Sequence, residues 1–329
     1  MRRNVGFSLL LASALGALVV AALPGTTSAF TAPAPPPLAI GSLASPLMLP
    51  VTSQQVTALH APLRTPSYFA QGPLVSVYGY PGICFMGELG CHDTAGAVAR
   101  ARELAAQYNQ PRPEAQAGAF PRYAIPALHL IVDVAQPTPQ ADGSYLARTP
   151  VEDVRAHVEA ARAAGVLLFL DLQVGWGDPL AAVARLEEFL REPFVHVALD
   201  PEFATKPYGR PPGSVIGTLD VAQVRPVQTY LARLAAERGL PPKILVLHQF
   251  TPDMLVGMTD LEPSPDVDVV VDMDGFGGQP EKLGGYGRYA RAPYAEYSGF
   301  KLFFHWDTPL FTPQQLMVLD QPPHYIVYQ

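Results

Sequence analysis

The chain has 329 residues, of which 49% are hydrophobic and only 16% are charged, and its formal net charge at pH 7 is −7. This negative charge disfavours nucleic acids and anionic membrane surfaces as partners, because both are themselves negatively charged. The length and the hydrophobic content suffice for one large core, such as an α/β barrel of about 250 residues.

The first 29 residues have the pattern of an export signal. Two arginines open the segment, an uncharged and mostly apolar run from Val5 to Leu23 follows, and small residues precede Phe30. We therefore expect a secreted or cell-envelope-associated protein, with an uncleaved membrane anchor as the alternative. No second apolar run of spanning length follows, so no integral membrane domain is expected after signal cleavage.

Residues 30–72 are rich in Pro, Ala, Ser and Thr, and Arg64 is their only Lys, Arg, Asp or Glu. Such a composition offers no periodic apolar face, so we expect a disordered, polyproline-like tether that folding does not require. The folded domain is then predicted to occupy residues 73–329.

The two cysteines, Cys84 and Cys91, stand close together in the chain. An isolated close pair in an exported protein indicates a disulfide bond, and the spacing lacks the C-x-x-C pattern of redox or zinc sites.

From Leu74 onward, short apolar runs alternate with helical stretches. The predicted strands are Val75–Tyr80, Leu128–Val134, Val166–Leu172, Phe194–Asp200, Lys243–His248, Val267–Asp272, Phe300–Trp306 and Tyr325–Tyr328. The predicted helical stretches are His92–Gln110, Pro150–Ala164, Pro179–Arg191, Val221–Arg238, Pro252–Gly257, Gln279–Glu296 and Pro313–Leu319. Asp220 is expected to cap the helix that begins at Val221, and Gly239 to end it.

Eight strands that alternate with helices predict an α/β (β/α)8 TIM barrel. The last strand lies at the C-terminus, so no closing eighth helix follows it, and the N-terminal segment is a candidate to cover that gap. A doubly wound sheet is the alternative fold. It is disfavoured because no G-x-G-x-x-G fingerprint follows the first strand.

Polar side chains stand at the end of nearly every predicted strand. In a (β/α)8 barrel these carboxyl ends meet at one rim, which is where active sites lie. The predicted binding residues are Tyr80, Asp133, Asp171, Gln173, His248, Gln249, His305, Trp306, Asp307 and Tyr328, with Trp176 added from a loop because flat rings suit the apolar faces of sugars.

Asp200 and Glu202 end the fourth strand and are predicted to point the same way, since side chains alternate along a strand. Paired carboxylates at a barrel mouth suit glycoside hydrolysis, in which one carboxyl group is held neutral as acid and the other stays ionised. We expect Glu202 to be the acid, with a pKa raised by Asp200. Asp272 or Asp274 is its predicted partner, and Asp307 is the alternative.

The Asp200-x-Glu202 ending resembles the strand-four motif D-x-x-D-x-D-x-E of the chitinase-like glycosidases of family 18. Glu202 matches the catalytic Glu and Asp200 the Asp before it, whereas Ala198 and Val195 stand where the other two Asp residues occur. The chain as a whole resembles exported bacterial barrels of the glycoside-hydrolase-like kind. From the rim carboxylates and aromatic side chains we expect a monomeric hydrolase that acts on a polysaccharide or cell-wall glycan without a cofactor.

Two other functions remain open from the sequence. The rim acids Asp133, Asp171, Asp200, Glu202, Asp272 and Asp274, with His248 or His305, could bind a divalent cation in a metal-dependent hydrolase, although no ligand spacing motif supports a metal. The second is a non-catalytic barrel that binds a glycan or peptide at the cell surface. His129 and His196 are predicted to be hydrogen-bonded core residues.

Overall fold

The structure is a computed structural model that describes residues 65–109 and 123–329. The predicted signal peptide and most of the predicted tether lie outside these residues. Within the described ranges, no helix combines the length and the apolar character that crossing a membrane requires.

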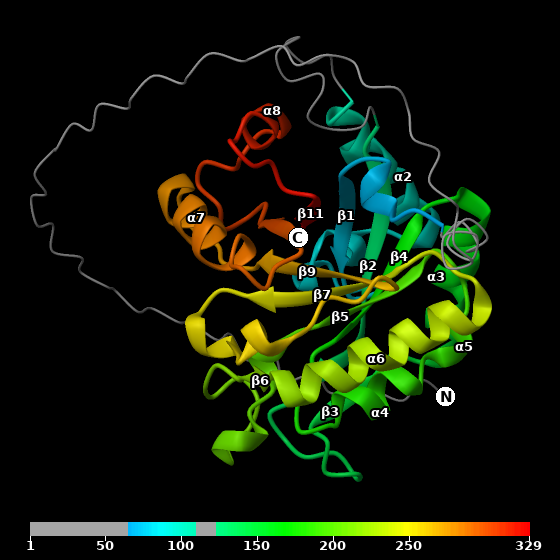
Figure 1. Ribbon diagram of the computed structural model, residues 1–329, viewed down its shortest axis with the longest axis vertical. Helices are drawn as coiled ribbons and strands as arrows, with labels where there is room; N and C mark the ends of the chain where they lie inside the picture. The colour runs from blue at the N-terminus through cyan, green and yellow to red at the C-terminus, as the bar shows by residue number, and fades with distance from the viewer. Residues whose placement is uncertain (1–64, 110–122) are drawn as a thin grey trace, which may run out of the picture. The chain divides into compact units, whose positions relative to one another are not determined.

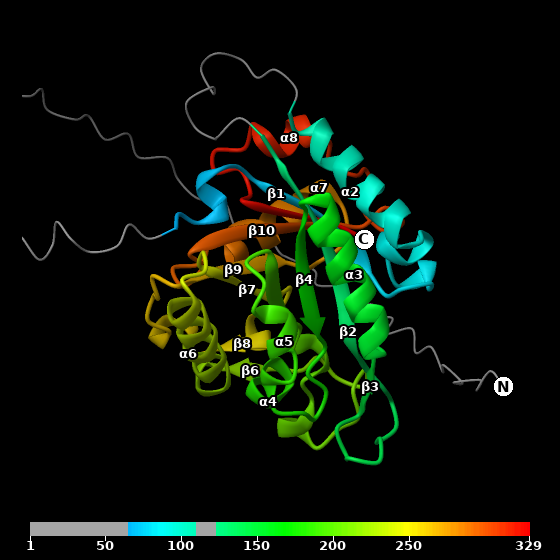
Figure 2. The same ribbon diagram turned by 90° about the vertical axis from the view of Figure 1, so that its right-hand side faces the viewer.

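Eight parallel strands form a closed barrel, in which the last strand pairs with the first (Figure 1). In hydrogen-bonded order they are β1 (Leu74–Gly79), β2 (Ile125–Ala135), β4 (Leu167–Leu172), β5 (Val195–Leu199), β7 (Lys243–Gln249), β9 (Val267–Met273), β10 (Tyr297–Leu302) and β11 (Tyr325–Tyr328). The predicted (β/α)8 TIM barrel, with its final strand at the C-terminus, is therefore confirmed. A short strand β3 (Leu146–Arg148) pairs antiparallel with the carboxyl-terminal end of β2 (Figure 2).

Helices connect the barrel strands on the outside. They are α2 (Thr94–Gln107), α3 (Val151–Ala164), α4 (Pro179–Ala184), α5 (Glu187–Leu190), α6 (Val221–Arg238), α7 (Gln279–Gly285), which continues into a π-helical turn, and α8 (Pro313–Met317). The longest, α6, begins and ends as predicted. Asp220 accepts a hydrogen bond from the N–H of Gln223 at 3.1 Å, and Gly239 adopts the left-handed conformation, with φ of 63°.

Two connections differ from the predicted helices. The stretch predicted as one helix over Pro179–Arg191 is divided in two at Leu186, which leaves the helical conformation and buries its side chain. No α-helix connects β7 to β9. The chain there forms 3-10 turns and a two-residue strand β8 (Leu255–Val256), which pairs with β6 (Leu219–Asp220). Proline and glycine bound this stretch, so it is too short for a stable helix.

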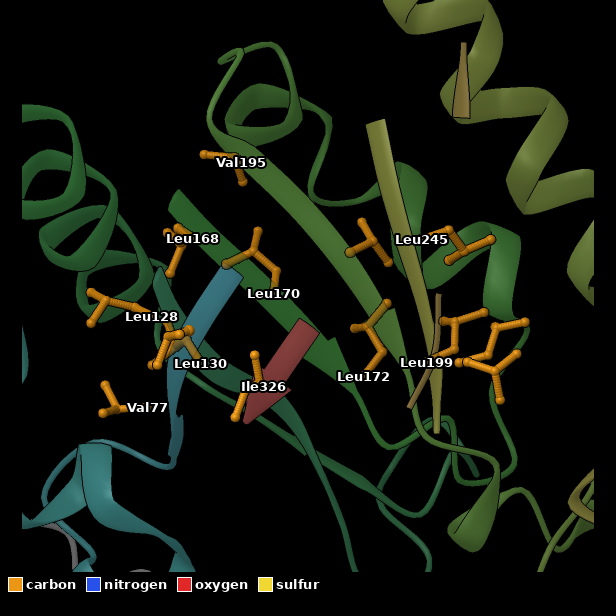
Figure 3. Close-up of a cluster of buried hydrophobic side chains, with 14 of the residues drawn as sticks. Val77, Leu128, Leu130, Leu168, Leu170, Leu172, Val195, Leu199, Leu245 and Ile326 are labelled. Atoms are coloured by element: carbon orange, nitrogen blue, oxygen red, sulfur yellow. The ribbon is translucent and has the colours of Figure 1, made fainter. Parts of the chain in front are cut away.

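The apolar side chains of each strand divide into two sets. Those that point outward pack against the helices, as Figure 3 shows for Leu128 of β2, Leu170 of β4 and Leu245 of β7. Those that point inward, such as Phe169 and Val246, fill the barrel interior. This alternation fixes which side chains can reach the mouth of the barrel, and it is interrupted at one place, in β2.

The predicted seventh strand began at Phe300 and ended at Trp306, but β10 begins three residues earlier and ends at Leu302. A buried carboxylate holds the following residues in a turn. Asp307 accepts hydrogen bonds from the N–H of Phe303 at 2.9 Å and from Gly277 at 3.0 Å, and its Oδ2 lies 2.8 Å from Nζ of the buried Lys282. Because β10 ends at Leu302, the inward-facing Lys301 stands at the carboxyl end of the strand.

The predicted tether boundary at residue 72 is wrong at its last residues, because Ser67–Ala70 pack on the barrel. Phe69 is buried and stacks on Tyr297 with ring centroids 4.2 Å apart. Ser67 donates a hydrogen bond to Asp268 at 2.6 Å, and Tyr68 contacts the edge of His196. Asp268 and Tyr297 lie at the amino ends of β9 and β10, so this segment covers the end of the barrel opposite to the mouth.

The predicted disulfide between Cys84 and Cys91 is present in the β1–α2 connection. We expect thiol labelling of the unfolded, unreduced protein to find no free thiol. Because the closed loop is short, reduction should cost about 2–3 kcal/mol and loosen this connection without unfolding the barrel. The measurement is the melting temperature with and without reductant. A Cys84→Ser/Cys91→Ser variant is the control and should not respond to reductant, and two reactive thiols in the wild type would contradict the prediction.

Candidate active site

Inward-facing polar side chains gather at the carboxyl ends of the barrel strands. They are Tyr78 (β1), His129 (β2), Asp171 (β4), Asp200 (after β5), His248 (β7), Asp272 and Asp274 (β9) and Lys301 (β10). All are almost completely buried, except that Asp274 retains a small exposed fraction. Acids from three separate strands, Asp171, Asp200 and Asp274, thus lie in one cluster.

Glu202 projects from a turn and not from the strand. The strand β5 ends at Leu199, and Pro201–Phe203 form a 3-10 turn that Asp200 caps by accepting a hydrogen bond from the N–H of Glu202 at 2.9 Å. The next loop folds back onto this turn and needs a glycine there, because a Cβ on Gly217 would lie 2.4 Å from the carbonyl oxygen of Pro201. These contacts hold Glu202 half-buried beside Asp200.

Glu202 is kept neutral by its surroundings. Burial raises the pKa of Glu202, and the nearby Asp200 and Asp274 carboxyl groups raise it further, to about 8, although Lys301 and His248 oppose the shift. Burial likewise raises the pKa of Asp200 to about 7. The predicted upward shift at Glu202 is therefore confirmed, with burial as its largest cause and Asp200 as the second.

Asp274 has the opposite character. Its Oδ1 lies 2.9 Å from Nζ of Lys301, and its Oδ2 lies 3.0 Å from Nδ1 of His248. Burial alone would raise the pKa of Asp274, but the Lys301 ammonium and His248 outweigh it and lower the pKa to about 2. Lys301 is held in turn over the ring of Tyr78, with Nζ 3.8 Å from the centroid. The mouth thus combines a neutral carboxyl group with an ionised one.

Beneath the mouth, Asp171 lies between two histidines. Its Oδ2 is 3.4 Å from Nε2 of His129 and 3.6 Å from Nε2 of His248. The other nitrogen of the His248 ring, Nδ1, lies 3.4 Å from Oδ2 of Asp272 and also faces Asp274. Burial opposes the protonation of His248, but Asp171, Asp272 and Asp274 outweigh it and raise its pKa well above the usual value.

Asp272 fits into the barrel wall because its neighbour on β10 has no side chain. A Cβ added to Gly299 would lie 2.7 Å from Oδ1 of Asp272, so any larger residue would displace this carboxylate. Neither oxygen of Asp272 accepts a hydrogen bond from any group in the described residues. Asp272 therefore acts on the mouth through His248, and it is too buried to meet a substrate.

An apolar pocket of about 330 Å³ opens at the carboxyl ends of β1, β10 and β11. Its lining combines the disulfide loop with the turn after β10, and consists of Cys84, Phe85, Gly87, Glu88, Cys91, Phe304, His305, Trp306 and Gln329. Phe85 and Trp306 are about half exposed, at 57% and 44%. Two predicted binding residues, His305 and Trp306, thus line a pocket on the same rim as the carboxylates.

Asp133 does not reach the mouth, contrary to the prediction. A β-bulge between Ile131 and Asp133 shifts the register of β2 against β4, so that Asp133 pairs with Leu172 and faces outward. There its Oδ1 accepts a hydrogen bond from Arg185, between α4 and α5, at 2.6 Å. Simple alternation along β2 predicted Asp133 on the same side of the strand as His129. The extra residue in the bulge turns the Asp133 side chain to the opposite side.

Four other predicted binding residues serve the architecture. Gln173 accepts a hydrogen bond from the N–H of Ala135 at 2.9 Å, and Gln249 accepts one from the Tyr294 hydroxyl at 2.8 Å. The Tyr328 hydroxyl bonds to that of Tyr108 in the outer layer, and Asp307 holds the turn after β10. Because Asp307 is buried and paired with Lys282, it is not the catalytic partner considered as an alternative.

Trp176 and Tyr80 lie near the rim and are half-buried. The Trp176 indole donates to Thr205 Oγ1 at 3.2 Å and to the carbonyl of Arg210 at 3.1 Å, so it fixes the loop that follows Glu202.

Sequence reasoning gave no functional role to Lys301 and His129. Lys301 escaped notice because the seventh strand was placed too late in the chain. His129 was recognised as interior but interpreted as a core residue, although it faces Asp171. The alternation of side chains along each strand was the available signal for both residues. It puts His129 on the inner side of β2, and Lys301 on the same side of β10 as Tyr297.

No protein-family model matches the chain, and no curated protein matches it.

Proposed function

We propose that the protein is an exported glycoside hydrolase of the (β/α)8 type, which cleaves an extracellular or cell-wall glycan with Glu202 as general acid. The observation that carries this proposal is a pair of carboxyl groups in opposite surroundings at the barrel mouth, Glu202 held beside Asp200 and Asp274 paired with Lys301. Glu202 has a pKa raised to about 8, whereas Asp274 has a pKa lowered to about 2. Glycoside hydrolysis requires such a pair.

In this mechanism Glu202 gives its proton to the glycosidic oxygen as the bond to the leaving sugar breaks. Asp274, held ionised by Lys301, is the second carboxylate. It acts as nucleophile or as base toward water, according to its separation from Glu202. Water supplies the hydroxyl for the sugar and the proton that restores Glu202. Asp200 and Asp274 help to keep Glu202 neutral, and Asp200 also positions it through the cap on its N–H.

The apolar pocket supports a sugar as the ligand. Phe85, Phe304 and Trp306 offer ring surface, which matches the apolar faces of a pyranose, and His305 and Gln329 offer polar groups beside it. A secreted or cell-envelope location, expected from the N-terminal pattern and compatible with the disulfide, would bring the barrel into contact with glycans.

The test is a screen of the purified protein against polysaccharides, cell-wall fragments and aryl glycosides, with released reducing ends as the readout. Glycan binding without cleavage would contradict the hydrolase proposal and favour a non-catalytic barrel that binds glycans at the cell surface.

The pH profile of a cleaved substrate should show a loss of kcat/KM above pH 8. Glu202 works as an acid only while protonated, so activity is expected below its pKa of about 8 and should fall about tenfold per pH unit above it. The profile is measured with a substrate whose leaving group needs protonation. An aryl glycoside with a highly acidic leaving group is the control, because its departure requires little proton transfer. Activity that instead rises through pH 8 would show that Glu202 acts as a base.

A further inference from the structure

We propose that His129, Asp171 and His248 form a binding site for one divalent transition-metal ion, best matched by Zn²⁺, inside the barrel beneath the catalytic carboxylates. The three side chains come from β2, β4 and β7, and their ligating atoms all lie within 4.8 Å of one another. Two imidazole nitrogens and one carboxylate oxygen are a donor set that zinc accepts.

The two separations between Asp171 and the histidines fit a shared ion better than they fit direct hydrogen bonds. Asp171 Oδ2 lies 3.4 Å from Nε2 of His129 and 3.6 Å from Nε2 of His248. A charge-assisted N–H···O bond would draw these atoms to about 2.7–2.9 Å. Around a tetrahedral zinc ion with bonds of about 2.0–2.2 Å, neighbouring ligand atoms stand about 3.3–3.6 Å apart.

The same atoms are buried without hydrogen-bond partners. Within the described residues, both oxygens of Asp171 and the Nε2 atoms of both histidines form no hydrogen bond, and all three side chains are at most 1% exposed. Buried polar atoms are otherwise satisfied in folded proteins, so a set of them that converges on one point needs an explanation. A cation held by all three supplies it.

The second nitrogen of each histidine is oriented as in metal sites. Nδ1 of His129 lies 2.8 Å from the Tyr325 hydroxyl, and Nδ1 of His248 lies 3.0 Å from Oδ2 of Asp274. On a neutral ring such outer partners select the tautomer that leaves Nε2 free, and at His248 the ion would take the place of the Nε2 proton. In contrast, His196 is equally buried in the barrel and also has an unpartnered Nε2, but within the described residues it forms no ion pair with a carboxylate.

The charges of the interior also favour a cation. Asp171, Asp272 and Asp274 are buried together, and the cationic groups beside them are Lys301, which pairs with Asp274, and His248 when it is protonated. Buried carboxylates are stable only when paired or when they coordinate a metal. Because its ligands are closed off from solvent, the ion would not touch a substrate. It would hold three strands together and fix His248 against Asp274.

The experiment is metal binding to the full chain, without any substrate. After chelator treatment and addition of Zn²⁺ or Co²⁺, elemental analysis should find one ion per chain, and bound Co²⁺ should show the visible absorption of a tetrahedral site. His129→Gln, Asp171→Asn and His248→Gln should each weaken binding by more than about 100-fold. His196→Gln is the matched control, a buried barrel histidine outside the trio, and should bind as the wild type does.

If the three variants fail to fold, X-ray absorption on the wild-type protein with zinc decides the question. Two imidazoles and one carboxylate at about 2.0–2.2 Å are expected in the first shell. A folded wild-type protein that binds neither ion would overturn the proposal, as would an ion lost equally from the His196→Gln control. Neither outcome bears on Glu202 as the acid, since no glycan enters this measurement.

Discussion

Glu202→Gln is expected to lower turnover of a glycan substrate by about 10²- to 10⁴-fold, the contribution typical of a general acid. Glutamine has the shape of the neutral carboxyl group but no transferable proton. With a pKa raised to about 8, Glu202 is already neutral at pH 7, so the substitution changes little else. KM and the melting temperature should therefore remain near the wild-type values while kcat falls.

Two further variants sharpen this experiment. Asp253→Asn is the control, since Asp253 is an exposed acid in the connection after β7, and its activity should match the wild type. Asp274→Asn should also lose turnover, but it leaves the buried Lys301 without its ion-pair partner and should lower the melting temperature as well. A Glu202→Gln protein that cleaves at near-normal rates would show that the acid has been assigned wrongly.

Removal of residues before Pro73 is expected to destabilise the barrel strongly. The truncation deletes Phe69, which is 6% exposed and stacked on Tyr297, and it leaves the buried Asp268 without Ser67. Phe69→Ala alone should cost about 3–5 kcal/mol, as large-to-small changes in cores do. For a domain of this size, that loss corresponds to a fall of roughly 6–20 °C in the melting temperature.

The matched control for Phe69→Ala is Phe85→Ala. Phe85 is 57% exposed at the opposite end of the barrel, so its truncation should change stability by no more than about 0.5 kcal/mol. Thermal unfolding of the full chain, the two variants and the chain that starts at Pro73 gives the comparison. Equal melting temperatures for the full and truncated chains would mean that the segment adds nothing to the fold.

The sequence by itself determined the fold class and the end of the barrel that carries the acids. Buried parallel strands are mostly apolar runs that alternate with helices, and this pattern can be recognised from short stretches of sequence. Both ends of α6 were predicted correctly, because Asp220 and Gly239 cap the helix through contacts with residues close to them in the sequence. The disulfide followed from the short separation of Cys84 and Cys91.

Only the tertiary structure decided which polar residues share the interior. One additional residue in the bulge of β2 turned Asp133 away from the mouth. The turn held by Asp307 and Lys282 ends β10 at Leu302, which puts the inward-facing Lys301 at the carboxyl end of the strand. Phe69 sits in a proline-rich stretch without periodicity and is buried through contact with β10, more than 200 residues away. The closeness of His129, Asp171 and His248 likewise depends on the strand register of the closed barrel, which local sequence patterns do not encode.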